Sequence, residues 1–470
     1  MRGASSSKPV NRNVVVAVLL SGAFIAILNQ TLLATALPAF MRDLDITANT
    51  AQWLTTIFML VNGVMIPITA FLIQRFTTRS LFLTAMGLFT AGTVVCMLAP
   101  SFAVLLTGRV VQAAGAGIIM PLMQTILFAI FPVHKRGTVM GTFGLVIAFA
   151  PAIGPSLSGW IVDHYPWQTL FQMIVPFAVV DIIVAAIILR NVTERAFPKV
   201  DVASIIMSTL GFGGLLYGFS MAGALGWTSP TVLGSLFGGA AVLVVFIWRQ
   251  LRLAEPVLEF RVFRYRMFTL NTAIGMVVFI VMIGGTTVLP LYMQNMRGFP
   301  AVESGLVLLP GALLMGLSSP ITGRIFDAFG AKWLALIGTA IVTGSTFFFA
   351  VLTVDTSFTY LAVVNTIRMV GTAMVLMPVT TAALNELPRS LIPHGTAMNN
   401  TMRQMAASIG TAVLVTVMTS AALDGSPAGL VHGANISFLV AGFIGVAGIV
   451  MSLFIRPRGE SVRDSGPQTG

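Results

Sequence analysis

Arg109 and Asp181 are ionisable residues that stand inside long apolar runs of the sequence. Arg109 lies seven residues into the run 102–130, and Asp181 lies fourteen residues into the run 167–190. A charge in apolar surroundings costs a few kcal/mol or more unless it meets water or a partner, so both side chains are expected to point into the protein. A carboxyl in such surroundings binds a proton more readily than in water, as a proton carrier requires. Proton binding controlled by a nearby arginine is the chemistry that these residues predict.

Asp181 is predicted to be the proton-coupling site, with Arg109 setting its protonation. The alternatives are a neutral, hydrogen-bonded Asp181 that does not titrate, and a structural Arg109 that binds neighbouring carbonyls. Glu303 and Asp163 are second candidates for coupling, because they stand near the ends of apolar runs, where water reaches them. Arg368 also lies within an apolar run, and a structural role is predicted for it.

Amide and thioether side chains share the apolar runs with these charges. The residues predicted to line a substrate site are Asn29, Gln30, Gln112, Met120, Met123 and Gln124. Amides bind a ligand through hydrogen bonds but carry no proton, and thioethers adapt to apolar molecules of many shapes. Packing is the alternative role, since polar side chains also cross-link membrane helices through hydrogen bonds.

The composition is typical of an integral membrane protein. Hydrophobic residues make up 56% of the 470 residues and charged residues only 9%, against roughly a quarter charged in soluble proteins. The 26 Lys and Arg exceed the 15 Asp and Glu, and their positions assign the excess to a membrane surface and not to nucleic acid. The sequence has no phosphate-binding Gly-Lys-Ser/Thr loop, no metal-spaced cluster and no loop long enough for a catalytic domain. We therefore expect no enzyme activity, cofactor or metal.

Fourteen apolar runs are close to the ~20 residues that cross a lipid bilayer as a helix. They cover residues 14–38, 51–73, 81–99, 102–130, 137–163, 167–190, 202–222, 231–248, 268–293, 303–323, 333–353, 358–384, 395–421 and 434–455. The predicted fold class is an all-α integral membrane protein with 14 transmembrane helices.

The positive charges are distributed unevenly between the predicted loops. With the amino end in the cytoplasm, Arg42 and Arg297 lie on the outer side, Arg109 and Arg368 lie within spans, and the other 22 of the 26 lie on the inner side. Short cytoplasmic loops carry an excess of Lys and Arg. The sequence therefore predicts a multi-pass protein of the cell membrane with both termini in the cytoplasm.

The second half of the chain repeats the first in the same order. Residues 37–41 (LPAFM) recur at 289–293 (LPLYM), 67–69 (PIT) at 320–322 (PIT), Arg109 as Arg368, and 137–140 (GTVM) at 395–398 (GTAM). Two like-oriented six-helix bundles, helices 1–6 and 9–14, are the plan of a secondary transporter with its substrate between the halves. The predicted domains are a tail at 1–13, a bundle at 14–190, a linker with two extra helices at 191–266, a bundle at 267–455 and a tail at 456–470.

The run 137–163, GTVMGTFGLVIAFAPAIGPSLSGWIVD, is rich in glycine and proline. Prolines bend a membrane helix, and glycines let a second helix come close. Pro151, Gly154, Pro155 and Gly159 resemble the antiporter signature in the fifth helix of exporters of the Major Facilitator Superfamily. A kinked packing helix without a role in transport is the alternative.

A second resemblance to this family lies in two loops, AFLIQRFTTR at 70–79 and GRIFDAFGAK at 323–332. In the family this loop closes the cytoplasmic gate through a carboxylate and arginines near helix ends. The residues that the resemblance assigns to this gate are Gln74, Arg75, Arg79, Asp327 and Lys332. Gln74 stands where the family has an acid, so the first latch is expected to be weaker than an ion pair.

With 108–112 (GRVVQ) and the pair Arg403-Gln404, these motifs make the chain similar to the fourteen-helix drug:proton antiporters of this superfamily, most of all to their lincomycin-resistance branch. The resemblance covers residues 14–455. It implies a transporter that exports small lipophilic, often cationic compounds against protons by alternating access. We expect a monomer in the lipid bilayer, and the need for an adaptor protein is left open.

One departure from the family keeps a different function open. Many such exporters have an acid in the first helix, where this chain has Asn29 and Gln30, so proton coupling here needs another acid. The alternative function is a flippase or exporter of lipids or envelope precursors, or a membrane sensor of the same fold that transports nothing.

Overall fold

The computed structural model describes residues 12–192 and 200–457, and these residues form fourteen long helices. The first seven are α1 (Arg12–Asp43), α2 (Ala48–Arg75), α3 (Thr78–Met97), α4 (Phe102–Ile130), α5 (Arg136–His164), α6 (Thr169–Ile188) and α7 (Val202–Leu225). The others are α8 (Pro230–Arg252), α9 (Arg266–Leu291), α10 (Ala301–Phe329), α11 (Lys332–Phe348), α12 (Phe358–Asn385), α13 (Ile392–Ser420) and α14 (Pro427–Leu453). The predicted all-α fold with fourteen long helices is confirmed. Parts of the predicted tails and linker (1–11, 193–199 and 458–470) lie outside the described residues.

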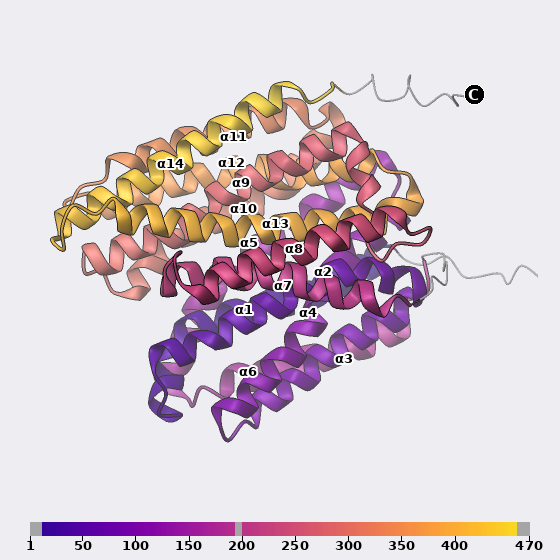
Figure 1. Ribbon diagram of the computed structural model, residues 1–470, viewed down its shortest axis with the longest axis horizontal. Coiled ribbons are helices and arrows are strands. Elements are labelled where there is room, and N and C mark those ends of the chain that lie inside the picture. Colours follow the sequence, from indigo (N-terminus) through magenta and orange to yellow (C-terminus); the bar gives the residue numbers. More distant parts are fainter. Residues whose placement is uncertain (1–11, 193–199, 458–470) are drawn as a thin grey trace, which may run out of the picture.

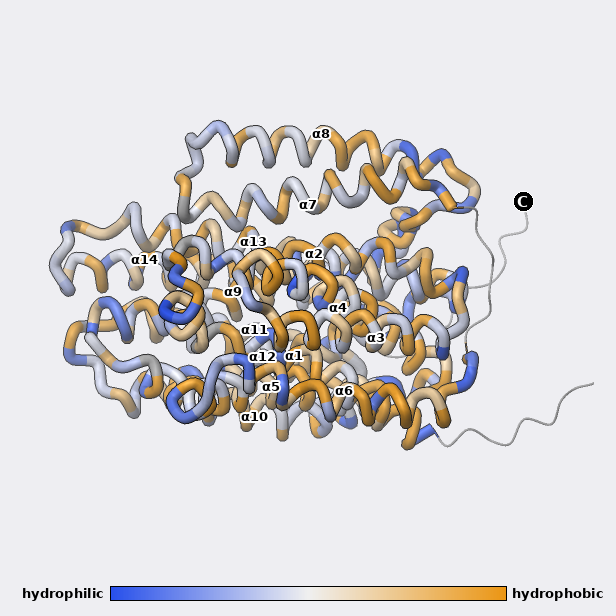
Figure 2. Tube along the Cα trace, turned by 90° about the horizontal axis from the view of Figure 1, so that it is seen from below, coloured by the Kyte–Doolittle hydropathy of each residue, from blue (hydrophilic) through white to orange (hydrophobic). Residues whose placement is uncertain are grey.

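The helices run side by side between two ends of the molecule, with hydrophilic residues gathered at both ends (Figures 1 and 2). We call the end at which α1 begins and α14 ends the terminal end, and the opposite one the far end. Thirteen of the described helices are long and apolar enough to cross a membrane. The exception is α13, whose first half carries His394, Asn399, Asn400 and Arg403. Because α13 packs against α2, α4, α9 and α14, these polar side chains meet protein and not lipid.

Helices α1–α6 and α9–α14 form two bundles with matching internal contacts, seen below and above in Figure 1. The pairs α1–α5, α2–α4, α3–α4 and α3–α6 of the first bundle correspond to α9–α13, α10–α12, α11–α12 and α11–α14 of the second. Each residue match in the sequence therefore falls on an equivalent helix. The exact limits of the two domains stay a prediction.

Helices α7 and α8 form the inserted pair, which lies along one side of the bundles in Figure 2. Of the two, α7 packs against α2 and α13. At the terminal end the pair is held by Arg249, which donates to both carboxylate oxygens of Asp201 at 3.1 Å. Burial raises the pKa of Asp201, but hydrogen bonds from Ser204 and Arg249 outweigh it and hold the pKa below its usual range. This stabilisation is present at neutral pH and lost as the pH falls through the lowered pKa.

The two bundles meet along two seams, α5–α10 and α2–α13. Glycines let the backbones approach most closely in the first seam. A Cβ atom on Gly141 would lie 2.9 Å from Pro320 Cα, and one on Gly323 would lie 2.9 Å from the carbonyl carbon of Gly137. Small residues at such positions are typical of tight helix contacts in membranes. Gly137, Gly141 and Gly144 of the run 137–163 thus serve the contact between the two halves.

We predict that Gly141→Val forces α5 and α10 apart at the terminal end, because the valine side chain has no space against the α10 backbone. Spin labels on cysteines at the exposed positions 134 and 328, in a Cys96→Ala background, would report a longer distance by double electron–electron resonance. Gly87→Val is the matched control, since no atom lies within 4 Å of a Cβ placed there. An unchanged distance in Gly141→Val would contradict the close contact.

Candidate functional site

A cavity of about 1170 Å³ lies between the two bundles. Its walls come from α1, α2, α4 and α5 of the first bundle, from α9, α10, α12 and α13 of the second, and from α7. Exposed lining residues such as Gln52 and Gln294 stand at the far ends of their helices, so the cavity opens at the far end. Most of the wall is apolar, with amide and hydroxyl side chains between the apolar ones. The described lining residues include no Asp or Glu.

The structure brings some of the predicted substrate-site residues to this cavity and places the others behind its wall. Gln30 and Met120 line it. Asn29 and Gln112 are buried beside it and bind Arg109, Met123 is buried in the core, and Gln124 accepts a hydrogen bond of 2.8 Å from Asn400.

The residues of the predicted antiporter signature lie on more than one face of α5. Pro151 and Pro155 line the cavity. Gly154 packs against Thr31 of α1, where a Cβ would collide with the threonine side chain. Gly159 stands in open space, since no atom lies within 4 Å of a Cβ placed there. The signature therefore contributes both to the cavity wall and to the α1–α5 contact.

Arg109 is fully buried between α4, α1 and α2. It donates to Asn29 Oδ1 at 2.9 Å and to the Leu54 carbonyl oxygen at 3.1 Å, and also to the Gln112 side chain. Its guanidinium lies over the Phe58 ring, 4.1 Å from the centroid, and the same ring lines the cavity. Phe58 therefore separates this cation from the cavity. Asn29 and Gln30 stand where many related exporters have an acid in the first helix. Since Asn29 binds Arg109 directly, the contact supports a structural role for Asn29.

Arg368 has an equivalent position in the second bundle. It is buried on α12 and donates to Asn365 Oδ1 at 2.9 Å and to the Val281 carbonyl at 3.4 Å. Val281 is the repeat counterpart of Asn29, by the same shift of 252 that relates 37–41 to 289–293. A Cβ on Gly285 would overlap the guanidinium, so this glycine makes the space for it. These contacts support the structural role predicted for Arg368.

Asp181 lies away from the cavity, between α6, α1 and α3. Ser21 of α1 donates to its Oδ1, while its Oδ2 is buried and has no hydrogen-bond partner among the described residues. Phe82 and Met86 of α3 surround the same space beside Gly22. Ser21 precedes Asn29 by eight residues, or about 12 Å along a helix. Asp181 and Arg109 therefore occupy separate positions on α1 and do not face one cavity.

The second candidates for proton coupling both lie at the far end. Glu303 is half-buried in the first turn of α10, and Asp163 is exposed in the last turn of α5. Neither is among the residues that line the cavity. The structure thus places no described carboxylate in the cavity, and Asp181 remains the acid that is most deeply enclosed by helices.

Arg403 is a cavity residue that the sequence reasoning missed. The charge distribution assigned it to the inner side, but it lies within α13 and lines the cavity with only 8% of its surface exposed. The assignment failed because Arg403 stands in the polar first half of the predicted run 395–421 and is therefore counted with the charges of the inner side. Residues Asn400, Arg403, Gln404, Ala407, Ser408 and Thr411 line the cavity at helical spacing, which is the signal that could have found it.

At the terminal end, Asp327 of α10 joins the two bundles. Its carboxylate accepts hydrogen bonds from the Gly137 N–H at 2.8 Å and from the N–H and hydroxyl of Thr138 at 2.7 Å, all at the start of α5. A carboxylate at a helix N-terminus is stabilised by the unpaired N–H groups and by the helix dipole. Beside it, Arg136 donates to Asn385 of α12 at 2.8 Å.

The repeat counterpart of this contact lies across the α2–α13 seam. Gln74 corresponds to Asp327 by the shift of 253, and its side-chain amide lies 2.8 Å from His394 Nε2 at the start of α13. His394 Nδ1 accepts from the Glu259 N–H at 3.2 Å, and His394 Nε2 faces the side-chain amide of Gln74. The first contact is a neutral hydrogen bond where the second is a carboxylate on a helix terminus.

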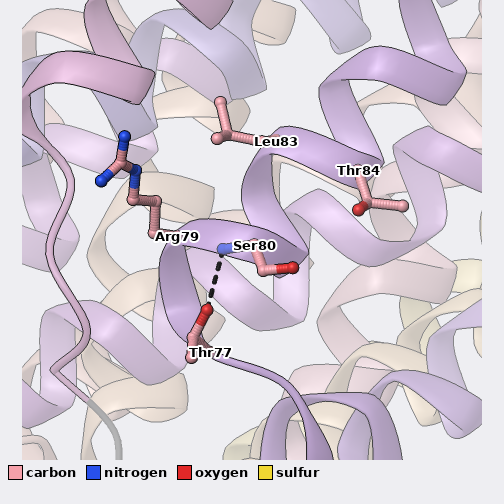
Figure 3. A pocket seen from close by; sticks show the side chains of 5 residues that line it. All are labelled: Thr77, Arg79, Ser80, Leu83 and Thr84. Atoms are coloured by element: carbon pink, nitrogen blue, oxygen red, sulfur yellow. Dashed lines mark hydrogen bonds between the residues drawn. The ribbon is translucent and has the colours of Figure 1, made fainter.

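The basic residues of the predicted gate lie at the surface of the terminal end. Arg79 is exposed beside a small pocket lined by Thr77, Ser80, Leu83 and Thr84 (Figure 3). The Thr77 side chain accepts a hydrogen bond from the Ser80 N–H at 3.1 Å and so caps α3. In Figure 3 the side chains of Arg79 and Thr84 point away from each other. Arg75 ends α2 and Lys332 begins α11. Asp327, Gln74 and Arg136 make contacts that join the bundles here.

Two like-oriented six-helix bundles around a central cavity define a membrane transporter. The profile of the Major Facilitator Superfamily matches residues 19–411, and the chain belongs to this superfamily. It is therefore a multi-pass membrane transporter and not an enzyme, as predicted.

Several known proteins resemble the chain over almost its whole length. The uncharacterised transporter YcnB of Bacillus subtilis is 55% identical over 97% of this chain and 98% of its own. The lincomycin resistance protein LmrB of the same organism is 42% identical over 94% and 95%, which confirms the predicted resemblance to that branch. The structure of the human organic anion transporter MFSD10 matches with a TM-score of 0.71 at 14% identity, covering 95% of this chain and 100% of that one. At this identity the likeness shows the fold alone.

We predict that Asp327→Asn weakens the closure of the terminal end. Loss of the charge that faces the α5 N-terminus should cost about 1 kcal/mol or more, a shift of about fivefold in the equilibrium between closed and open ends. Thr125 is buried below the cavity, 2.9 Å from Thr396 of the other bundle. A cysteine at position 125, with Cys96→Ala, should therefore react faster with N-ethylmaleimide in Asp327→Asn.

Asp355→Asn is the matched control for this test, since Asp355 is an exposed acid near the far end. It should leave the labelling rate unchanged. Equal rates in all three proteins would show that Asp327 does not hold the bundles together.

Proposed function

We propose that this protein exports small lipophilic molecules across the cell membrane against protons, by alternating access, with the terminal end in the cytoplasm. The observation that carries the proposal is a large cavity between the bundles that is open at one end and closed at the other. Asn400 and Gln124, and below them Asp327 and Gln74 with their partners, close the terminal end. Rocking of one bundle against the other would break these contacts and open the cavity to the cytoplasm.

The substrate class is supported by the cavity wall and by one relative. Apolar and thioether side chains dominate the wall, and such surfaces accept molecules of different shapes. Amides and hydroxyls, Gln30 and Asn62 among them, supply hydrogen bonds for orientation. The name of LmrB assigns it to lincomycin resistance, and we extend drug export from that protein to this one. The expected preference for cations is not part of the proposal, because the described wall has no carboxylate.

Asp181 is the proposed proton-coupling residue, and α1 is the element that would connect it to the cavity. Ser21, which donates to Asp181, and Gln30, which lines the cavity, stand on the same helix about 14 Å apart. A proton on Asp181 would change its bond to Ser21 and so shift the balance between two positions of α1. Arg109 then serves to hold α1, α2 and α4 together, and the coupling does not require it to touch the acid.

In inverted membrane vesicles, we expect an imposed pH gradient, acid inside, to drive uptake of lincomycin or of lipophilic dyes of different charge. Collapse of the gradient with nigericin should reduce uptake to the level of vesicles without the protein. Uptake that is indifferent to the gradient would remove proton coupling from the proposal, while leaving transport in place.

We expect Asp181→Asn to reduce the rate of gradient-driven uptake by at least about tenfold. Substrate should still equilibrate along its own concentration gradient, because only the coupling step is removed. The same variant should no longer release protons when substrate is added in detergent. Asp355→Asn, which changes an exposed acid, is the matched control. Proton release that survives Asp181→Asn undiminished would show that another acid, such as Glu303 or Asp163, carries the proton.

A further inference from the structure

Arg403 is the charged residue among the described residues that line the cavity. It lies in the middle of α13, and 92% of its surface is covered by protein, since 8% is exposed. A guanidinium keeps its charge at every working pH. An uncompensated charge in such a position carries a free-energy cost, so its presence calls for a partner.

No hydrogen bond or ion pair of Arg403 is found among the described residues. Its guanidinium instead lies against the Phe279 ring of α9, whose centroid is 4.9 Å from the guanidinium carbon. The other enclosed arginines differ in this respect, because Arg109, Arg136 and Arg368 each donate to protein acceptors. The donors of Arg403 therefore remain available to a molecule inside the cavity.

The surroundings of Arg403 fit a ligand with one acidic group and an apolar body. Gln404 and Ser408 stand on the same face of α13 and add hydrogen-bond donors near the guanidinium. Phe279 holds the guanidinium by a cation–π contact, which leaves the donor groups at its edge for a planar acceptor. Carboxylate, sulfonate and phosphate groups match these donors, and a bidentate contact is the strongest form of such a pair.

We propose that the cavity binds amphiphilic organic anions, with the acidic group on Arg403 and the apolar body along the methionine- and phenylalanine-containing wall. This inference deepens the proposed function, on which it rests for the direction of transport but not for binding. It also sets a preference against cations, which would meet a like charge and no carboxylate in the described wall. Neutral lipophilic molecules should bind through the wall alone and more weakly.

Three probes that share one fluorophore test the proposal: dansylglycine, its methyl ester and dansylcadaverine, with charges of −1, 0 and +1. Binding to the purified, full-length protein in detergent is measured by the rise of dansyl fluorescence. We expect the wild-type protein to bind dansylglycine about 10- to 100-fold more tightly than the ester, the range of a hydrogen-bonded charge pair. Dansylcadaverine should bind no better than the ester.

The variants Arg403→Gln and Arg403→Lys separate the charge from the fold. Arg403→Gln should bind the ester as the wild type does and lose the preference for dansylglycine, while Arg403→Lys should keep part of it. Arg42→Gln removes an exposed positive charge at the far end. It should change neither the binding of the ester nor the preference for dansylglycine. A preference for dansylglycine that survives Arg403→Gln, or a wild type that binds all three probes equally, would overturn the proposal.

Two further arms identify the source of the anion and separate this proposal from the previous one. If phosphatidylglycerol in nanodiscs displaces dansylglycine and phosphatidylcholine does not, the acidic group belongs to a lipid headgroup and the proposal of a small organic anion is overturned. Uptake of the dansyl ester into inverted vesicles tests export separately. Export of the ester without any anion preference would leave the proposed function standing, whereas anion binding without uptake of either probe would refute export alone.

Discussion

A positive charge enclosed by membrane helices must be neutralised or solvated by the protein itself, since lipid offers neither. Three arginines of this chain meet that demand in different ways. Arg109 binds two side-chain amides and a carbonyl, and Arg368 binds an amide and a carbonyl in a space that Gly285 provides. Both find hydrogen-bond acceptors within one bundle and stabilise it, although Arg109 Nη2 and Arg368 Nε have no partner among the described residues. Arg403 lies between the bundles and has no hydrogen-bond acceptor among the described residues, which makes it the group on which ligand binding is proposed to depend.

The two bundles are alike in plan and differ where they close. Asp327 puts a full negative charge on the N-terminus of α5, whereas its counterpart Gln74 makes a neutral hydrogen bond to His394 at the start of α13. The weaker contact lies in the α2–α13 seam, and α7 packs against both of these helices. Additional packing by α7 thus accompanies the weaker of the two contacts, while the α5–α10 seam is held by close glycine contacts and a charge.

Helix α1 has a central place because it meets three distinct environments along its length. Its first half binds Asp181 through Ser21, and its middle binds Arg109 through Asn29 and supplies the neighbouring Gln30 to the cavity wall. A helix is stiff over these distances, so a change at one of the three positions is felt at the others. This arrangement would allow the proposed proton site and the proposed substrate site to be coupled without sharing residues.

The sequence alone determined the class of protein, the fourteen helices and the repeat, because the length of an apolar run and the order of repeated motifs are properties of the chain. It also marked Arg109, Arg368 and Asp181 as enclosed, since each stands alone in an apolar run. Only the tertiary structure decided which charges face one another. It separated Asp181 from Arg109, placed the Phe58 ring between Arg109 and the cavity, and brought Arg403 to the cavity wall. Hydropathy cannot supply this, because it measures how apolar a segment is and not which neighbour each of its faces meets.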